Sequence, residues 1–266
     1  IGRECGDVNA ATGLSHLPGS PLALIGRDKP MELFTTGAGL EVLMRWLHVF
    51  AGVIWIGVLY YFNFIQTPFF GTEVGGPAKG PMTRGLVPNA LWWFRWGAMF
   101  TFLSGWTIVG YRAMSLGIPM TDGYMTKIMT GGLMGTFMFA NVWFVIWPAQ
   151  QVVIANAEQV AAGGDPIPEA AARGGKAGMA SRTNTLFSIP MLFFMISAAN
   201  LPGFLSGTND MMYWLVAGGV IVAVEINGLI GPGAATQKPL TSVSGTIHGG
   251  LALWLVLYLI GALLNS

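Results

Sequence analysis

An uncharged apolar run that follows Arg45 constrains this chain more than any other feature. In the stretch RWLHVFAGVIWIGVLYYFNFIQ, residues 45–66, no charged side chain follows Arg45. A helix of about 20 residues, with a rise of about 1.5 Å per residue, crosses the roughly 30 Å hydrocarbon core of a bilayer. The run therefore predicts a transmembrane helix.

The composition extends this prediction to the whole chain. Of its 266 residues, 53% are hydrophobic and only 9% are charged, which is typical of polytopic membrane proteins rather than of soluble domains. The 13 basic and 12 acidic side chains give a formal net charge of +1, so no basic excess indicates a nucleic-acid partner. The expected partners are the lipid bilayer and other proteins, with no nucleic acid.

Further apolar segments bring the predicted number of spans to six. They lie at 91–111, 128–147, 185–200, 212–231 and 241–264. Pro148 is expected to mark the end of the third span, because proline interrupts a helix. The predicted fold class is all-α, a polytopic integral membrane helix bundle of about six transmembrane helices.

Two regions are expected outside the spans. Residues 1–39 hold three prolines, several glycines and no apolar run long enough to cross a bilayer, and they predict an extramembrane N-terminal arm. Residues 40–266 form the predicted transmembrane bundle. Within it, alanine-rich pieces on either side of GGDPIP predict a helical hairpin insertion at about 148–182.

Basic residues near the predicted spans indicate an orientation. One side of the membrane would carry Lys79, Arg84, Arg95, Arg173, Lys176, Arg182 and Lys238. The other side would carry Arg3, Arg27, Lys29, Arg45, Arg112 and Lys127, of which Arg3 is remote from the membrane. The small excess on the first side favours both termini outside the cytoplasm, so we expect a bacterial inner-membrane protein with periplasmic termini.

Two of the three histidines lie in predicted spans, His48 in the first and His248 in the sixth. Imidazole is a common axial ligand of haem iron, and a histidine inside a membrane needs a partner. Gly52 lies one turn from His48 and glycines flank His248, which leaves patches where a flat macrocycle could approach. The residues predict either a b-type haem with both imidazoles as iron ligands, or two histidines that are hydrogen-bonded within the bundle. His16, in the arm, is expected to be solvated.

Four further charged side chains are candidate functional residues. Arg45 either pairs with a haem propionate or a quinone oxygen, or extends to lipid headgroups from the edge of its span. Arg95 and Arg182 are alternative partners for a propionate. Glu225 is the one carboxylate well inside an apolar segment, and it is a candidate for a proton path or, because it lies near the GPG at the end of that segment, an interfacial residue.

Several chemistries have no support in the sequence. Phosphate loops, Gly-x-Ser-x-Gly elbows, His-Glu-x-x-His motifs and dinucleotide fingerprints are not found where their structural context requires them. The single cysteine, Cys5, excludes an intrachain disulfide and the Cys-x-x-Cys-His motif that attaches a c-type haem, so any haem is expected to be held non-covalently. No residue is singled out as catalytic.

Three blocks together resemble a known family: RWLHVFAGVIWIGVLYYFNF at 45–64, ALWWFRWGAMFTFLSG at 90–105, and NVWFVIWPAQQVVI with ASRTNTLFSIPMLFFMIS at 141–154 and 180–197. They are similar to the membrane domain of the PuuD-type urate hydroxylase family, the urate oxidase N-terminal domain, and the likeness covers most of residues 41–265. The first helix, with His48, Trp55 and Gly57, also resembles that of HemJ-like haem proteins.

The resemblance implies an integral-membrane redox protein. Members of this family commonly carry a cytochrome c domain after the last helix, whereas this sequence stops at Ser266. They also have a histidine near the end of the fourth span, where this chain has Asn200. We therefore expect either that a separate cytochrome c accepts the electrons, or that the chain is a non-catalytic subunit of a larger membrane bioenergetic complex.

The leading hypothesis is electron transfer through a b-type haem held by His48 and His248, with Arg45 at a propionate. Urate as substrate is suggested by the family name alone. The alternative is the structural subunit, and a third interpretation is a proton or small-solute channel that uses Glu225.

Overall fold

The computed structural model describes residues 31–206, 210–230 and 233–264. It divides the chain into two units, Ile1–Leu40 and Glu41–Ser266. In the first unit the described residues include the short helix α1 (Glu32–Thr35), where the Thr36 hydroxyl donates a hydrogen bond to the Glu32 carbonyl over 3.0 Å. Most of the predicted arm, with Cys5 and His16, lies outside the described residues.

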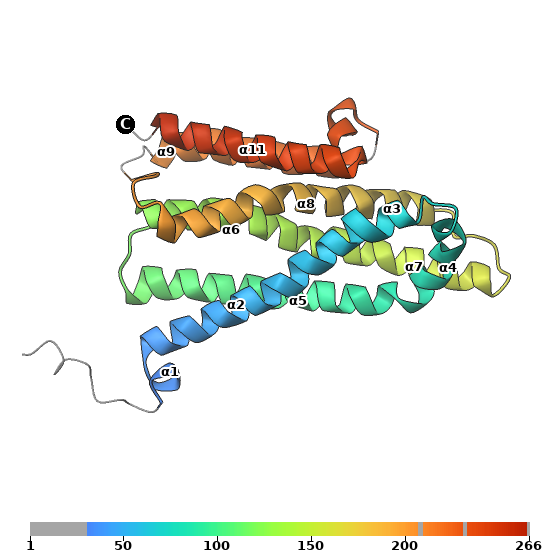
Figure 1. Cartoon of the computed structure of the whole chain (residues 1–266), viewed down its shortest axis with the longest axis horizontal. Helices are drawn as coiled ribbons and strands as arrows, with labels where there is room; N and C mark the ends of the chain where they lie inside the picture. Colours follow the sequence, from blue (N-terminus) through green and yellow to red (C-terminus); the bar gives the residue numbers. More distant parts are fainter. Residues whose placement is uncertain (1–30, 207–209, 231–232, 265–266) are drawn as a thin grey trace, which may run out of the picture. The chain divides into compact units, whose positions relative to one another are not determined.

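Every described element of regular structure is helical, which confirms the predicted all-α class (Figure 1). The elements after α1 are α2 (Gly37–Tyr60), η2 (Tyr61–Gln66), α3 (Thr67–Phe69), α4 (Gly75–Gly85), α5 (Val87–Gly110), η3 (Tyr111–Ser115), α6 (Gly123–Ala140), η4 (Asn141–Ile146), α7 (Trp147–Ala161), α8 (Ala170–Asn200), α9 (Asp210–Tyr213), η5 (Trp214–Gly218), α10 (Gly219–Leu229), η6 (Ala235–Thr241) and α11 (Val243–Leu264).

Helices occupy all six predicted spans, but only four are long and apolar enough to cross a membrane. In the described residues these four are Gly37–Phe69, Gly123–Ala161, Met211–Leu229 and Val243–Leu264. The other two positions are α5 and α8. Helix α5 carries Arg95 among several tryptophans, and α8 begins with a polar part that contains Arg173 and Lys176. The protein is therefore a helical membrane protein in which four spans, rather than six, meet the requirements of length and composition.

Helix α8 is the centre of the larger unit. It packs against α6, α7, α10 and α11 (Figure 1). Its Phe187 and Phe194 are fully buried, as is Leu257 on α11. A Cβ atom on Gly250 of α11 would lie 2.9 Å from the Leu186 carbonyl oxygen, so glycine allows α11 to approach the backbone of α8 closely.

Two π-helical segments carry the long helices past proline. Segment η2 ends at Gln66, two residues before Pro68, and η4 ends at Ile146, two residues before Pro148. Proline lacks the N–H that an α-helix uses, and a π-turn is one way to accommodate that loss. The helix consequently continues from Gly123 to Ala161, so Pro148 does not interrupt it as the sequence predicted. The segment predicted as a helical hairpin, about 148–182, consists of α7 and the first half of α8, which contact each other.

Lys127 stabilises the end of α8 from inside the bundle. Its side chain is 1% exposed, and Nζ donates hydrogen bonds to the carbonyl oxygens of Leu201, at 2.8 Å, and Phe204, at 2.7 Å. Leu201 is the C-cap of α8, where a helix leaves carbonyl groups without intrahelical donors.

We expect Lys127→Met to destabilise the protein. The substitution removes two charge-assisted hydrogen bonds at the end of α8, which costs about 1–3 kcal/mol. Thermal unfolding of the purified protein in detergent should show a lower midpoint. Lys176→Met, at an exposed position of α8, is the control and should unfold like the wild type. Identical midpoints for the two variants would contradict a stabilising role for Lys127.

Candidate functional site

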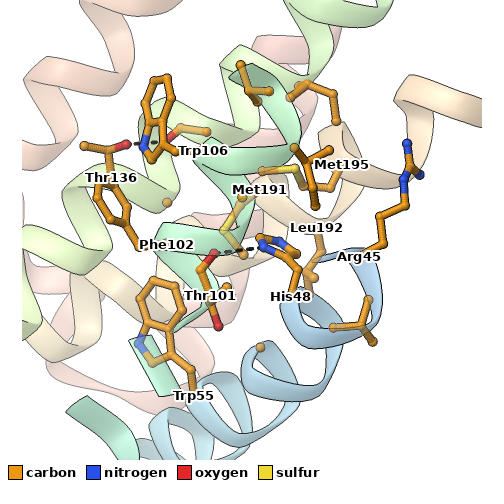
Figure 2. A pocket seen from close by; sticks show the side chains of 18 of the residues that line it. Arg45, His48, Trp55, Thr101, Phe102, Trp106, Thr136, Met191, Leu192 and Met195 are labelled. Atoms are coloured by element: carbon orange, nitrogen blue, oxygen red, sulfur yellow. Dashed lines mark hydrogen bonds between the residues drawn. The ribbon is translucent and has the colours of Figure 1, made fainter. Parts of the chain in front are cut away.

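The candidate site is a cavity of about 720 Å³ between α2, α5, α6 and α8 (Figure 2). All of its walls belong to the larger unit. The lining is mostly apolar, with aromatic, aliphatic and methionine side chains and several glycines. Its few polar or charged members are Arg45, His48, Tyr60, Thr101, Arg112, Tyr124 and Thr136. Apolar walls with a few polar groups, at this volume, are typical of small-molecule and cofactor sites.

His48 is held in this cavity by the backbone of α5. Its Nδ1 lies 2.9 Å from the carbonyl oxygen of Thr101 (Figure 2). It also lies 3.3 Å from Oγ of Ser104. A carbonyl can only accept, so Nδ1 carries the proton and donates it to Thr101. In the neutral ring the other nitrogen, Nε2, is an unprotonated base, and it makes no hydrogen bond with the described residues. A histidine whose second nitrogen is fixed by a backbone carbonyl is oriented as metal-binding histidines usually are.

Glycines on α5 make room for the imidazole. A Cβ atom on Gly105 would lie 2.9 Å from Cε1 of His48 and 3.2 Å from Nδ1. About two turns before it, a Cβ atom on Gly97 would meet the backbone of α2, at 3.1 Å from the backbone nitrogen of Trp55. The sequence indicated a side-chain-free patch at Gly52, but the glycine that touches the ring is Gly105, from another helix.

Two arginines lie at one end of the cavity and share one carboxylate. Glu41 Oε1 accepts hydrogen bonds from Nη2 of Arg45 and from Nε of Arg112, each at 2.7 Å. The Arg112 guanidinium also stacks on the ring of Tyr124, 4.5 Å from its centroid. Two cations against one carboxylate leave this end with a positive charge. Arg45 was predicted here, whereas Arg112 was counted only as a loop cation because its place depends on the fold.

Sulfur and indole groups complete the walls. Met125 and Met129 of α6 and Met191 and Met195 of α8 all line the cavity. Trp55 is 2% exposed, and its indole N–H has no hydrogen-bond partner among the described residues. A buried donor without a partner costs about 1–3 kcal/mol, so an acceptor on a bound ligand would be stabilised beside it.

The structure does not bring His248 into this cavity. Its side chain is exposed on α11, and Nδ1 lies 2.7 Å from the Ser244 carbonyl of the same helix. Arg95 is also absent from the lining, since its guanidinium stacks on the ring of Trp147, at 3.8 Å, and near that of Trp143, at 5.2 Å. Arg182 lines a different cavity. The pairing of His48 with His248 across one cleft therefore does not fit these positions.

Glu225 lies in a buried polar cluster. It is 6% exposed, and Oε2 accepts a hydrogen bond from Nδ2 of Asn141 over 3.2 Å. The same Asn141 amide donates to Oδ1 of Asn184 over 2.9 Å, and Asn184 donates to the Met138 carbonyl over 2.9 Å. The cluster joins η4, α8 and α10. Glu225 lines neither of the two cavities discussed here, and its use in a proton path stays a prediction.

Comparison with known proteins finds a family match over part of the chain. Residues 120–229 match the family described as urate oxidase N-terminal. This confirms, over that segment, the family resemblance predicted from the sequence. No curated protein and no solved structure matches the chain.

The urate oxidase N-terminal match divides the candidate site. The matched segment contains α6 and α8, which carry the four methionines that line the cavity. It also contains the polar cluster around Glu225. His48, Arg45, Arg112 and Gly105 lie before the matched segment. The match therefore supports the family of the central helices, and the chemistry of the cavity is argued from its geometry.

Proposed function

We propose that this protein is the membrane-embedded component of an oxidoreductase that resembles the PuuD-type membrane domain, and that it holds a b-type haem in the cavity at His48. A b-type haem supplies one-electron redox chemistry when it is bound. In this proposal the electrons pass to a separate cytochrome c, and urate is the substrate that the name of the matched family suggests. The proposed location is the bacterial inner membrane, with periplasmic termini.

The observation that carries the proposal is the state of His48. Its Nδ1 is engaged by the Thr101 carbonyl, and its Nε2 is left unprotonated in an apolar cavity. This is the state that an axial haem ligand requires, and the hydrogen bond to the carbonyl increases the basicity of the ring.

Other groups in the cavity fit the remaining parts of a haem. Arg45 and Arg112 would hold the propionate carboxylates, because both guanidinium groups lie at one end and only Glu41 neutralises them. Met191 and Met195, both from α8, place thioether groups in the same cavity (Figure 2). Methionine is a known second axial ligand, and it removes the need for His248 in that role. The volume of about 720 Å³ is within the range of cofactor sites.

The proposal is tested by a reduced-minus-oxidised absorption spectrum of the purified chain. A b-type signal, with haem that is extracted by acidic acetone because it is not covalently bound, would support it. A correctly folded sample without haem would contradict it and would leave the second hypothesis, a non-catalytic subunit of a larger membrane complex.

We expect Gly105→Ala to disturb the haem signal. The new methyl group would lie 2.9 Å from Cε1 of His48, which displaces the ring from its hydrogen bond to Thr101. The spectrum should shift or lose most of its intensity. Gly110→Ala, on the same helix with no atom within 4 Å of the added Cβ, is the control and should keep the wild-type spectrum. An unchanged spectrum in Gly105→Ala would show that the ring position is irrelevant to the haem.

A further inference from the structure

A second cavity, of about 1050 Å³, lies at the opposite end of the same helices. Along the first long helix, the lining residues of the first cavity end at Tyr60, and those of the second cavity begin at Phe62. Helices α5 and α8 show the same division, and α4 and α7 supply the remaining walls. The two cavities have no lining residue in common, so the second is a separate site.

The charged groups of the second cavity are all positive. Its lining includes Lys79 and Arg84 from α4 and Arg182 from α8, and it includes no aspartate, glutamate or histidine. None of the three cations forms an ion pair within the described residues. Arg182 donates one hydrogen bond, from Nη1 to the Leu240 carbonyl over 2.9 Å, and its other donors remain available. Such a lining favours an anion and disfavours a metal ion or an organic cation.

Amide side chains give this cavity hydrogen-bonding capacity that the protein does not use itself. Gln66 is only 7% exposed, yet its amide makes no hydrogen bond with the described residues, and its Oε1 is completely buried. Gln150 also lines the cavity, and its amide makes no hydrogen bond with the described residues. Leaving a buried amide unpaired costs about 1–3 kcal/mol, which a ligand with matching groups would recover.

The polar groups around Gln66 are held in place by the helices. Asn63, one turn earlier, donates from Nδ2 to the Leu59 carbonyl over 2.9 Å and to Oγ of Ser181 over 2.8 Å. Oδ1 of Asn156 accepts from the Ile167 backbone N–H over 2.7 Å, which leaves the NH₂ group of Asn156 as a donor. All three of Asn63, Ser181 and Asn156 line the cavity. A site with fixed amides can distinguish ligands by their pattern of donors and acceptors.

We propose that the second cavity binds a small organic anion that carries both hydrogen-bond donors and acceptors. Lys79, Arg84 and Arg182 would neutralise the negative charge, and the amides of Gln66 and Gln150 would pair with N–H and C=O groups of the ligand. An anionic lipid headgroup shares the negative charge but offers fewer groups to the amides. The proposal does not depend on haem, because the two cavities are separate.

The test is isothermal titration of the purified full-length chain in neutral phosphatidylcholine nanodiscs with orotate, a planar carboxylate with ring N–H and C=O groups. We expect orotate to bind, and benzoate, which has the carboxylate but lacks the other groups, to bind about tenfold more weakly. Gln66→Leu should reduce the affinity for orotate to about that for benzoate.

Charge variants provide the second part of the test. Lys79→Gln combined with Arg84→Gln should weaken orotate binding by about tenfold or more, and both side chains are exposed, so the fold is preserved. Arg182→Gln should do the same. Arg173→Gln, an exposed cation of α8 outside the cavity lining, is the control and should bind orotate like the wild type.

The remaining outcomes decide the source of the anion or overturn the site. If phosphatidylglycerol nanodiscs weaken orotate binding by the wild-type chain and a higher orotate concentration restores it, lipid headgroups compete for the same site and its anionic chemistry is supported. Absence of binding for orotate, benzoate and inorganic phosphate would overturn the proposal, as would binding that the charge variants leave unchanged. None of these results depends on a haem signal, so a failure here leaves the proposed function to its own test.

Discussion

His48→Ala is expected to abolish the haem signal, whereas His248→Ala is expected to keep it. His48 lies in the cavity with a free Nε2, and alanine offers no ligand in its place. His248 is exposed on α11 and bonds to its own helix at Ser244. Difference spectra of the two variants, with haem content measured against protein, check this result directly.

The two histidine variants also discriminate between the arrangements considered for this chain. Loss of the signal in both variants would restore the bis-histidine hypothesis and contradict the exposed position of His248. Retention of the signal in His48→Ala would remove the basis of the proposed site. His48→Ala also leaves space beside Gly105, so thermal unfolding of both variants is the appropriate control for folding.

The difference between the two histidines shows why local sequence could not assign the site. Each lies in an apolar helix with glycine nearby, so the local patterns are similar. The glycines beside His248 are used for helix packing, because Cβ atoms on Gly249 and Gly250 would meet Leu186, and Leu186 with Ile189, of α8. No side-chain-free cleft remains there for a ligand. This distinction depends on the partner helix, which the chain around His248 does not reveal.

Features that depend on one helix could be predicted, and those that need several could not. The lengths of the apolar runs predicted the helical class and the positions of the long helices. The position of Arg45, a single charge at the edge of a predicted span, made it a candidate site residue. Arg112 and the cavity methionines were missed, because each needs α2, α5, α6 and α8 to be placed together. Gly105 would have indicated the space for the imidazole of His48, because a glycine opposite a histidine allows close packing. That inference requires the knowledge that α2 packs against α5, which the sequence alone does not give.

Proline was misinterpreted for a local reason. The rule that proline ends a helix assumes α-helical geometry up to that point. Here a π-helical segment precedes Pro148, so the helix continues through it and carries Gln150 into the second cavity. A similar segment precedes Pro68, where it positions Gln66. Pro68 and Pro148 thus lie next to two of the amides proposed to bind an anion.

Gly228→Ala is expected to be among the most destabilising single substitutions in the bundle. A Cβ atom at this position would clash with Oγ1 of Thr183 and would lie only 3.0 Å from its Cβ. Thr183 is fully buried, and its hydroxyl donates to the Met179 carbonyl over 3.0 Å, so a β-branched side chain with a restricted χ1 has no free space to rotate into. Overpacking of this kind costs about 1–3 kcal/mol or more. Thermal unfolding in detergent should show a clearly lower midpoint.

The same helix offers a matched control. A Cβ atom on Gly219 of α10 would meet no atom within 4 Å, so Gly219→Ala should be neutral or should stabilise the protein by up to about 1 kcal/mol through its helix propensity. Equal unfolding midpoints for Gly228→Ala and Gly219→Ala would contradict the predicted contact between α10 and α8.

A double variant identifies the cause. Thr183→Ala removes the atoms that the new methyl group would meet, so Gly228→Ala combined with Thr183→Ala should recover much of the stability lost in Gly228→Ala alone. Thr183 precedes Asn184, and Gly228 lies one turn after Glu225, so the clash separates the two helices next to the buried carboxylate. A non-additive recovery would show that this single close approach holds α10 against α8, and that the polar cluster of Asn141, Asn184 and Glu225 depends on it.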